Sequence, residues 1–162
     1  MLNITLDAID RRILENLQDD ARMRNVDLAG KVGLSPSPCL RRVGNLKETG
    51  VIRSYATLVD AEAGGLPVSI FVNVTLEKQI ESVLETFEEH IRARPEVMEC
   101  YLMTGEADYL LRVVTADLGA YERFLIEHLT RIPGVASIKS SFALKQVAYR
   151  TALPISPPGK SK

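Results

Sequence analysis

The stretch GLSPSPCLRRVGNLKE, residues 33–48, decides how the first third of the chain folds. Ser35 stands directly before a predicted helix, where its hydroxyl can accept a hydrogen bond from the first free backbone amides. Pro36 follows at the first helical position, because its missing N–H costs nothing there and its fixed φ suits a helix. At 100° of rotation per residue, one side of this helix is apolar. That side consists of Cys39, Leu40, Val43 and Leu46.

The other side of the same helix is polar. It carries Ser37, Pro38, Arg41 and Asn45, with Arg42 and Gly44 on its flanks. Upstream, Asn25 is predicted to cap a short helix over residues 26–32, and Gly33 is free to take a positive φ where the chain turns. A short helix, a turn with glycine and a capped second helix form a helix-turn-helix pattern.

A helix-turn-helix places its second helix in the major groove of DNA, with the N-terminal half at the base edges. Arg41 is then placed for base or phosphate contact, Ser37 for either, and Arg53 beyond the helix for a phosphate. The residues predicted to bind DNA are Ser35, Ser37, Pro38, Arg41, Arg42, Asn45, Lys47 and Arg53. The alternative for an isolated helix pair is an ordinary amphipathic helix whose polar side meets water.

The charge of the chain is nearly balanced. Its 162 residues are 46% hydrophobic, which is enough for the cores of one or two domains. Residues 1–60 hold 9 Lys and Arg against 8 Asp and Glu, and residues 61–162 hold 11 against 13, which gives the totals of 20 and 21. A strongly basic domain is therefore absent, and any DNA contact must come from a local patch.

A further helix and a β-rich segment flank the helix-turn-helix. Residues 6–19 predict a helix capped by Asp7, with Asp10 in its first turn. Its inner stripe consists of Ile9, Ile13, Leu14 and Leu17. Gly50 ends the third helix, and residues 51–59 alternate in polarity and predict a wing strand. We expect a DNA-binding domain over residues 1–60, with a linker strand over 51–66.

The second half of the chain has a different period. Residues 68–76 alternate apolar and polar side chains, which is typical of a half-buried strand. The elements that follow are a helix over 80–92, strands over 97–103 and 109–115, a helix from Asp117 to residue 131 and a strand over 135–147. The order βαββαβ predicts a ferredoxin-like domain over 67–150, so the fold class is α+β. The tail over 151–162 is expected to be loose or specially anchored.

One face of the predicted sheet lacks a cover. Both helices of a ferredoxin-like fold lie on one face, which leaves Phe71, Asn73, Thr75, Tyr101 and Met103 on the other. These side chains are too apolar for water, so the sequence predicts a homodimer that hides them. A helix-turn-helix also favours a dimer, because two recognition helices must reach two half-sites.

Two cysteines and the N-terminus indicate a reducing compartment. Cys39 and Cys100 have no metal-ligand spacing and are predicted to be buried thiols. No apolar run approaches the length of a membrane span, and no signal peptide is predicted. We expect a cytoplasmic protein without metal or cofactor.

Two sets of motifs resemble the Lrp/AsnC family of regulators (leucine-responsive/asparagine-operon, or feast/famine regulators). The first set consists of Leu6-Asp7, Ile9-Asp10, Ile13-Leu14, the stretch over 32–43 and Gly50-Val51-Ile52. The second consists of GEADYLL over 105–111, Ala120-Tyr121 and Pro133-Gly134-Val135. The resemblance covers roughly residues 5–150. It implies a winged helix-turn-helix, an amino-acid-sensing ferredoxin-like domain, and dimers that assemble into tetramers, octamers or larger rings. Gly44 departs from the charged or long residue usual at its place, which removes one groove contact.

A hairpin in the second half is the predicted effector site. An α-amino acid needs donors for its carboxylate, which backbone N–H groups at a glycine turn supply, and a carboxylate for its ammonium, which Asp108 supplies. By resemblance, Leu118 and Ala143 line the same site, and its apolar side chains hint at a neutral or apolar ligand. The predicted effector residues are Met103, Thr104, Gly105, Glu106, Asp108, Leu118 and Ala143. The alternative is an ordinary hairpin turn, with Glu106 facing solvent.

The sequence therefore predicts a DNA-binding transcriptional regulator that responds to an amino acid. An architectural DNA-compacting protein without an effector is one alternative. A second is an enzyme, because some haem-precursor decarboxylases share this architecture and use histidines. His90 and His128 are the only histidines, and neither lies in a recognisable nucleophile arrangement, so no catalytic residue is predicted.

Overall fold

A computed structural model describes residues 5–155, and the chain divides into two compact units. The helical unit comprises Met1–Thr57 together with Ala148–Lys162. The sheet unit comprises Leu58–Val147. The helical unit is therefore built from both ends of the chain, with the sheet unit inserted between them.

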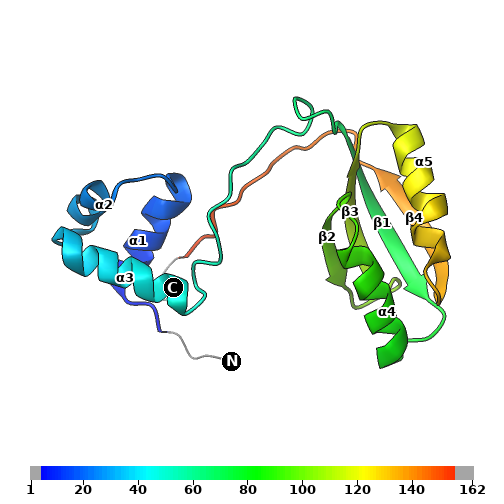
Figure 1. Ribbon diagram of the computed structural model, residues 1–162, viewed down its shortest axis with the longest axis horizontal. Coiled ribbons are helices and arrows are strands. Elements are labelled where there is room, and N and C mark those ends of the chain that lie inside the picture. Colours follow the sequence, from blue (N-terminus) through cyan, green and yellow to red (C-terminus); the bar gives the residue numbers. More distant parts are fainter. Residues whose placement is uncertain (1–4, 156–162) are drawn as a thin grey trace, which may run out of the picture. The chain divides into compact units, whose positions relative to one another are not determined.

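Three helices form the core of the helical unit (Figure 1). They are α1 (Ala8–Asp19), α2 (Asn25–Val32) and α3 (Pro36–Glu48). Their buried side chains form one cluster, which consists of Ile13, Leu14, Leu28, Ala29, Val32, Cys39, Val43 and Leu46. Apart from Leu40, the side chains predicted to face inward are buried or packed against this cluster. The helical period of the sequence thus decides the packing of all three helices.

The helix ends explain where each helix starts and stops. Asp7 caps α1 as predicted, since its carboxylate accepts from the backbone N–H of Ile9 at 2.8 Å and of Asp10 at 2.7 Å. The Asp10 side chain accepts from the Asp7 N–H in return, which completes a capping box. Gly33 ends α2 at φ +74°, a conformation that suits glycine because it has no Cβ. The turn of the helix-turn-helix depends on this residue.

Two predicted caps are wrong in detail. Asn25 is the first residue of α2 rather than its cap, and its side-chain amide donates to the Pro36 carbonyl at 2.8 Å. This bond ties the start of α2 to the start of α3. Ser35 does occupy the N-cap of α3, but its hydroxyl makes no capping hydrogen bond. Pro38 stands at the third helical position and has no N–H, which removes one of the two donors that a cap would satisfy.

Two further expectations for this unit are corrected. Leu40 was expected to face the core, yet 61% of its surface is exposed, because it lies at the edge of the apolar arc. Residues 51–59 form no strand: Val51 and Ile52 pack against the helical core, and the segment beyond them carries no ladder hydrogen bond among the described residues. A strand needs a partner, and no segment within residues 5–155 pairs with this one.

The sheet unit has the predicted order of elements (Figure 1). It comprises β1 (Val68–Leu76), α4 (Glu81–Arg92), β2 (Val97–Leu102), β3 (Tyr109–Thr115), α5 (Leu118–Glu127), the 3₁₀ helix η1 (Leu129–Arg131) and β4 (Val135–Phe142). The strands pair antiparallel in the order β2-β3-β1-β4. Alternate residues of β1 from Ile70 to Leu76 are buried against both α4 and α5, so the two helices cover the same face. This arrangement is the ferredoxin-like fold that the sequence predicts.

The last strand is shorter than predicted. It was expected to reach residue 147 but ends at Phe142, which pairs with Ile70 near the start of β1. The Ala143 N–H still donates to the Ser69 carbonyl at 2.9 Å. Beyond Ser69 only Val68 of β1 remains, so the ladder stops.

The C-terminal segment belongs to the helical unit, which the composition of the tail left open. The Gln18 side chain of α1 accepts from the Leu153 N–H at 2.6 Å and donates to the Leu153 carbonyl at 3.1 Å. Ile155 packs against the helical core. The described part of the tail is therefore anchored to α1.

Candidate DNA-binding and ligand-binding sites

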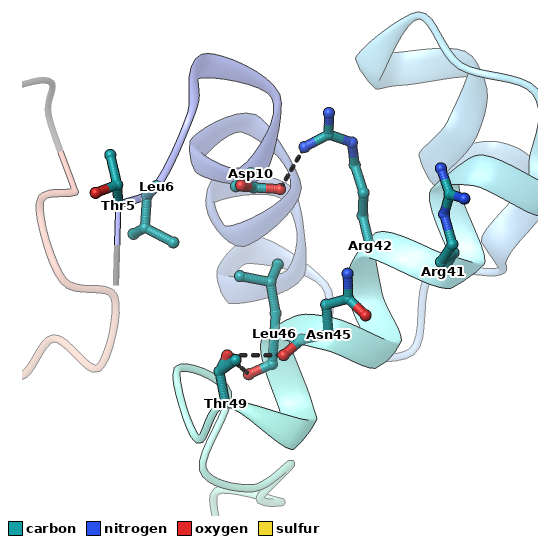
Figure 2. A pocket seen from close by; sticks show the side chains of 8 residues that line it. All are labelled: Thr5, Leu6, Asp10, Arg41, Arg42, Asn45, Leu46 and Thr49. Carbon is teal, nitrogen blue, oxygen red and sulfur yellow. Dashed lines mark hydrogen bonds and ion pairs between the residues drawn. The ribbon is translucent and has the colours of Figure 1, made fainter. Parts of the chain in front are cut away.

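The exposed side of α3 carries several of the residues that the sequence predicts to bind DNA. Ser37, Arg41 and Asn45 are exposed and follow one another at helical spacing along this side. Figure 2 shows Arg41 pointing away from the ion pair that its neighbour Arg42 makes. Its guanidinium is thus oriented for a partner outside the chain.

Arg42, in contrast, forms ion pairs within the protein. Its Nη1 donates to Asp7 at 2.7 Å and to Asp10 at 2.8 Å, which joins α3 to the N-terminus of α1. Figure 2 shows the bond to Asp10. The Asp10 N–H and, next, the Arg42 guanidinium hold the pKa of Asp7 below its usual value. Arg42 was predicted to bind DNA, but in this structure its charge is neutralised within the protein.

A cleft of about 450 Å³ lies beside this ion pair (Figure 2). It is lined by Thr5, Leu6, Asp10, Arg41, Arg42, Asn45, Leu46 and Thr49. The Thr49 hydroxyl donates to the Asn45 carbonyl at 2.7 Å and closes the last turn of α3 at one end of the cleft. Arg41 and Asn45 thus stand at the border between the cleft and the exposed side of α3.

The remaining predicted DNA contacts are spread around the start and the end of α3. Ser35 is exposed and Pro38 is half-buried, both near the N-terminus of the helix. Lys47 is exposed near the C-terminus, where its ammonium lies 4.9 Å from the centre of the Tyr55 ring. Arg53 is exposed in the segment after the helix. The structure thus brings Ser37, Arg41 and Asn45 together and places the others at the margins.

The predicted effector hairpin borders a pocket of about 220 Å³ in the sheet unit. It is lined by Asn73, Thr75, Met103, Thr104, Glu106, Ala107 and Lys139. Lys139 pairs with Asn73 across β4 and β1, on the sheet face opposite the helices. Glu106 and Lys139 give the pocket groups of opposite charge. Asn73, Thr75, Ala107 and Lys139 were not predicted for this site, because only the sheet register brings them to the hairpin.

Asp108 does not line this pocket. Its side chain is turned into the protein, and the residue is only 5% exposed. The carboxylate accepts from the Leu76 N–H at 2.7 Å and from the Gln79 amide at 2.5 Å. It therefore satisfies backbone and side-chain donors where β1 ends. Gly105 takes φ +130° in the hairpin, which favours glycine.

Leu118 and Ala143 lie at the other end of the sheet. β3 runs from the hairpin to Thr115, and Leu118 begins the helix that follows. Ala143 bonds to Ser69, next to the Val68–Thr115 pair. The seven residues of β3 span about 20 Å. Within one chain, the hairpin and this second pair of predicted effector residues do not meet.

The two histidines lie closer together than the sequence suggested. Both line a cavity of about 190 Å³ between the C-terminal ends of α4 and α5. His90 Nδ1 lies 2.6 Å from the Thr86 carbonyl, and Arg94 Nη1 lies 3.1 Å from His128 Nδ1. Cationic side chains stabilise helix C-termini, where the free carbonyls carry negative partial charge. Arg92 is such a cation in the last turn of α4.

Cys100 corrects another expectation, because it is exposed whereas Cys39 is buried. It stands beside Glu88 and Arg92, and local desolvation followed by the Glu88 charge raises the pKa of its thiol to about 11. The thiolate is therefore scarce at neutral pH, and Cys100 is a weak nucleophile. Among residues 5–155, no helix is long and apolar enough to cross a membrane.

Comparisons with known proteins match both units. Residues 6–53 match the winged helix-turn-helix DNA-binding family, and residues 69–153 match the family described as the Lrp/AsnC ligand binding domain. The chain is 53% identical to the Bkd operon transcriptional regulator of Pseudomonas aeruginosa, over 93% of this chain and 98% of the relative. It is 41% identical to the leucine-responsive regulatory protein of Rhizobium meliloti, over 91% of this chain and 94% of the relative.

Solved structures agree with these sequence matches. A transcriptional regulator of Neisseria meningitidis, solved as a complex with L-Met, superposes with a TM-score of 0.87 at 40% identity. The match covers 93% of this chain and 97% of that one. An AsnC family transcriptional regulator from Agrobacterium tumefaciens also gives a TM-score of 0.87 at 40% identity, over 92% and 97% of the two chains. The chain thus belongs to the Lrp/AsnC family of transcriptional regulators, with a winged helix-turn-helix DNA-binding domain followed by a ligand-binding domain.

Proposed function

We propose that the protein binds operator DNA through the exposed side of α3 and that an α-amino acid bound to the sheet unit changes its affinity or its assembly. The observation that carries the DNA-binding part is the placement of Arg41 between Ser37 and Asn45, on the second helix of a helix-turn-helix. A guanidinium in this position can donate two hydrogen bonds to the edge of a guanine or bind a phosphate.

Binding as a homodimer follows from the uncovered face of the sheet. Phe71, Tyr101 and Met103 are exposed on the side away from α4 and α5. Packing two copies through this face would remove their apolar surface from water. A two-fold dimer would also supply two α3 helices for a DNA site made of two half-sites. Such dimers would in turn assemble into tetramers or octamers.

The hairpin pocket is the proposed effector site, with an assignment of charges that differs from the sequence prediction. Glu106 lines the pocket and would pair with the ammonium group, whereas Asp108 is occupied by Leu76 and Gln79. Lys139 on the facing strand would pair with the carboxylate. Both are charge-assisted contacts of the kind that fix a zwitterion.

The class of effector follows from the size and lining of this pocket. Its 220 Å³ lies below the usual range of pockets for drug-sized ligands, which favours a small molecule. Met103 gives it an apolar wall, and we propose a small apolar amino acid. The L-Met bound to the Neisseria regulator and the names of the leucine-responsive relatives support this class.

Leu118 and Ala143 can belong to the same effector site only through a second copy of the chain. They lie at the end of the sheet opposite the hairpin, so one copy would contribute the hairpin and another would contribute Leu118 and Ala143. A ligand held between copies binds one arrangement of subunits better than another, and it can therefore shift assembly.

Arg41→Ala tests the DNA-binding part. We expect about tenfold weaker binding to a selected operator duplex, since one good base contact discriminates by about 1–3 kcal/mol. Arg12→Ala is the matched control, because Arg12 is also exposed and its loss changes the charge equally. Equal affinities for both variants would contradict the role of Arg41.

Glu106→Ala tests the effector part. A thermal-shift screen against the common amino acids first identifies the effector, and titration calorimetry then compares the two proteins. We expect the variant to lose measurable binding while it keeps its affinity for DNA. Glu85→Ala is the control, since Glu85 is exposed on α4 and does not line the hairpin pocket. Unchanged ligand affinity in Glu106→Ala would refute the assignment.

A further inference from the structure

Leu40 is the residue of α3 whose position contradicts the apolar pattern of the helix. Cys39, Val43 and Leu46 are buried, whereas Leu40 is 61% exposed. Among the described residues it is the one large apolar side chain of α3 that is exposed. A site where local pattern and structure disagree is often a functional one.

The surroundings of Leu40 indicate what it meets. It is the fifth residue of α3 and lies in the N-terminal half, which approaches the base edges in a helix-turn-helix. Ser37 lies one turn before it, and exposed Arg41 follows it directly. One turn later, Gly44 has nothing within 4 Å of the place where a Cβ would stand. The exposed surface here combines a hydroxyl, an apolar side chain and a guanidinium, next to a stretch of backbone without a side chain.

The major groove offers one apolar group, the C5-methyl of thymine, and apolar side chains read it by contact. Resting on the proposed binding of α3 to DNA, we propose that Leu40 contacts a thymine methyl in the operator and makes the protein prefer thymine at that position. The missing side chain at Gly44 leaves room for the duplex to approach this part of the helix.

Leu40 and Arg41 divide the recognition between them. A guanidinium recognises guanine or a phosphate by hydrogen bonds, whereas Leu40 adds a contact that only thymine provides. Burying one methyl group contributes about 0.8 kcal/mol, which corresponds to about a fourfold change in affinity. The effect is therefore small enough to refine a preference and large enough to measure.

Replacing the thymines of the operator with deoxyuridine, one position at a time, tests the contact, because deoxyuridine lacks only the methyl group. The operator is the tightest duplex selected by the wild-type protein from a random library, and affinities are measured at one fixed salt concentration. We expect wild-type affinity to fall about fourfold at one thymine, or at one in each half-site. Leu40→Ala should bind the thymine and deoxyuridine duplexes equally at those positions.

Val26→Ala is the matched control, since Val26 is an exposed apolar residue of α2. It should keep the wild-type ratio between the thymine and deoxyuridine duplexes. The inference is overturned if wild-type protein is insensitive to every substitution, or if Leu40→Ala keeps the wild-type ratio. These outcomes leave operator binding intact. A wild-type protein that selects no duplex would instead refute the proposed function and the inference with it.

Discussion

The helical unit and the sheet unit are stabilised by different kinds of contacts. Eight buried residues form the described core of the helical unit, against thirteen in the sheet unit. The sheet unit also has three antiparallel strand pairings that join distant parts of its sequence. Small cores leave little margin, because the fraction of surface buried falls with size.

The helical unit compensates with contacts between segments that are distant in the sequence. Arg42 joins α3 to Asp7 and Asp10, and Gln18 holds the returning C-terminal segment. The sheet unit instead uses a buried carboxylate, Asp108, which accepts from the backbone at the end of β1. The helical unit, which carries the exposed side of α3, therefore depends on contacts at its periphery. The sheet unit depends on its interior.

Truncating one buried leucine in each unit should have the largest effect and should distinguish the two units. Leu28 and Leu111 are both at most 2% exposed, and Leu→Ala in a core costs about 2–5 kcal/mol. We expect Leu28→Ala to unfold the helical unit and to abolish DNA binding, with the sheet unit still folded. Leu111→Ala should weaken the sheet unit without unfolding it. Hydrogen exchange followed by mass spectrometry resolves the two units, and equal loss of protection in both variants would contradict the difference.

Asp108→Ala should produce the next largest effect. It leaves the Leu76 N–H buried without an acceptor, which costs about 1–3 kcal/mol. Urea unfolding should show this loss. Glu106→Ala, at an exposed residue of the hairpin, should change stability by less than about 0.5 kcal/mol. If both variants are equally stable, Asp108 does not hold the end of β1.

Periodicity made most of the fold predictable. The apolar period of β1 and of the five helices decides which side of each element is buried, and the structure agrees at nearly every inner position. Asp7 and Gly33 could be assigned from residue type, because cap and turn chemistry is local. The failure at Leu40 has a geometric reason: a helical wheel gives an angle but not the width of the neighbouring surface.

The sites were less predictable, because they depend on contacts between distant residues. The sequence places Arg42 on the flank of α3, but it does not show that Asp7 and Asp10 lie within reach. It offers Asp108 as a ligand group, but only the folded structure shows that the Leu76 N–H donates to the Asp108 carboxylate. The sheet register adds Lys139 to the hairpin pocket. Short-range chemistry is readable in a sequence, whereas the partner of a side chain is not.

Shortening the tail tests whether the helical unit needs both ends of the chain. A chain that ends at Thr151 lacks the Gln18–Leu153 hydrogen bonds and the packing of Ile155. We expect it to lose about 1–2 kcal/mol from the helical unit, since each net hydrogen bond contributes about 1 kcal/mol. A chain that ends at Ile155 keeps these contacts and is the control. Exchange rates of the α1 amides measure the loss. Equal rates in both chains would show that the segment does not stabilise α1.

Acid should weaken the helical unit through Asp7, which is the smallest effect. The folded pKa of Asp7 is lowered by the Asp10 N–H and by Arg42, so its contribution is complete above the unfolded value of about 3.9 and is lost as the pH falls below it. Asp7→Asn keeps a good cap and removes the charge. Because Asp7 is half exposed, solvent screening limits the loss of unfolding free energy in Asp7→Asn at pH 7 to less than about 1 kcal/mol.

Between pH 5 and pH 3, the stability of Asp7→Asn should fall less steeply than that of wild type, as measured by exchange of the α1 amides. Glu15→Gln, at an exposed residue of the same helix, should follow the wild-type curve. Parallel curves for Asp7→Asn and wild type would mean that the Asp7 charge does not stabilise the junction of α1 and α3.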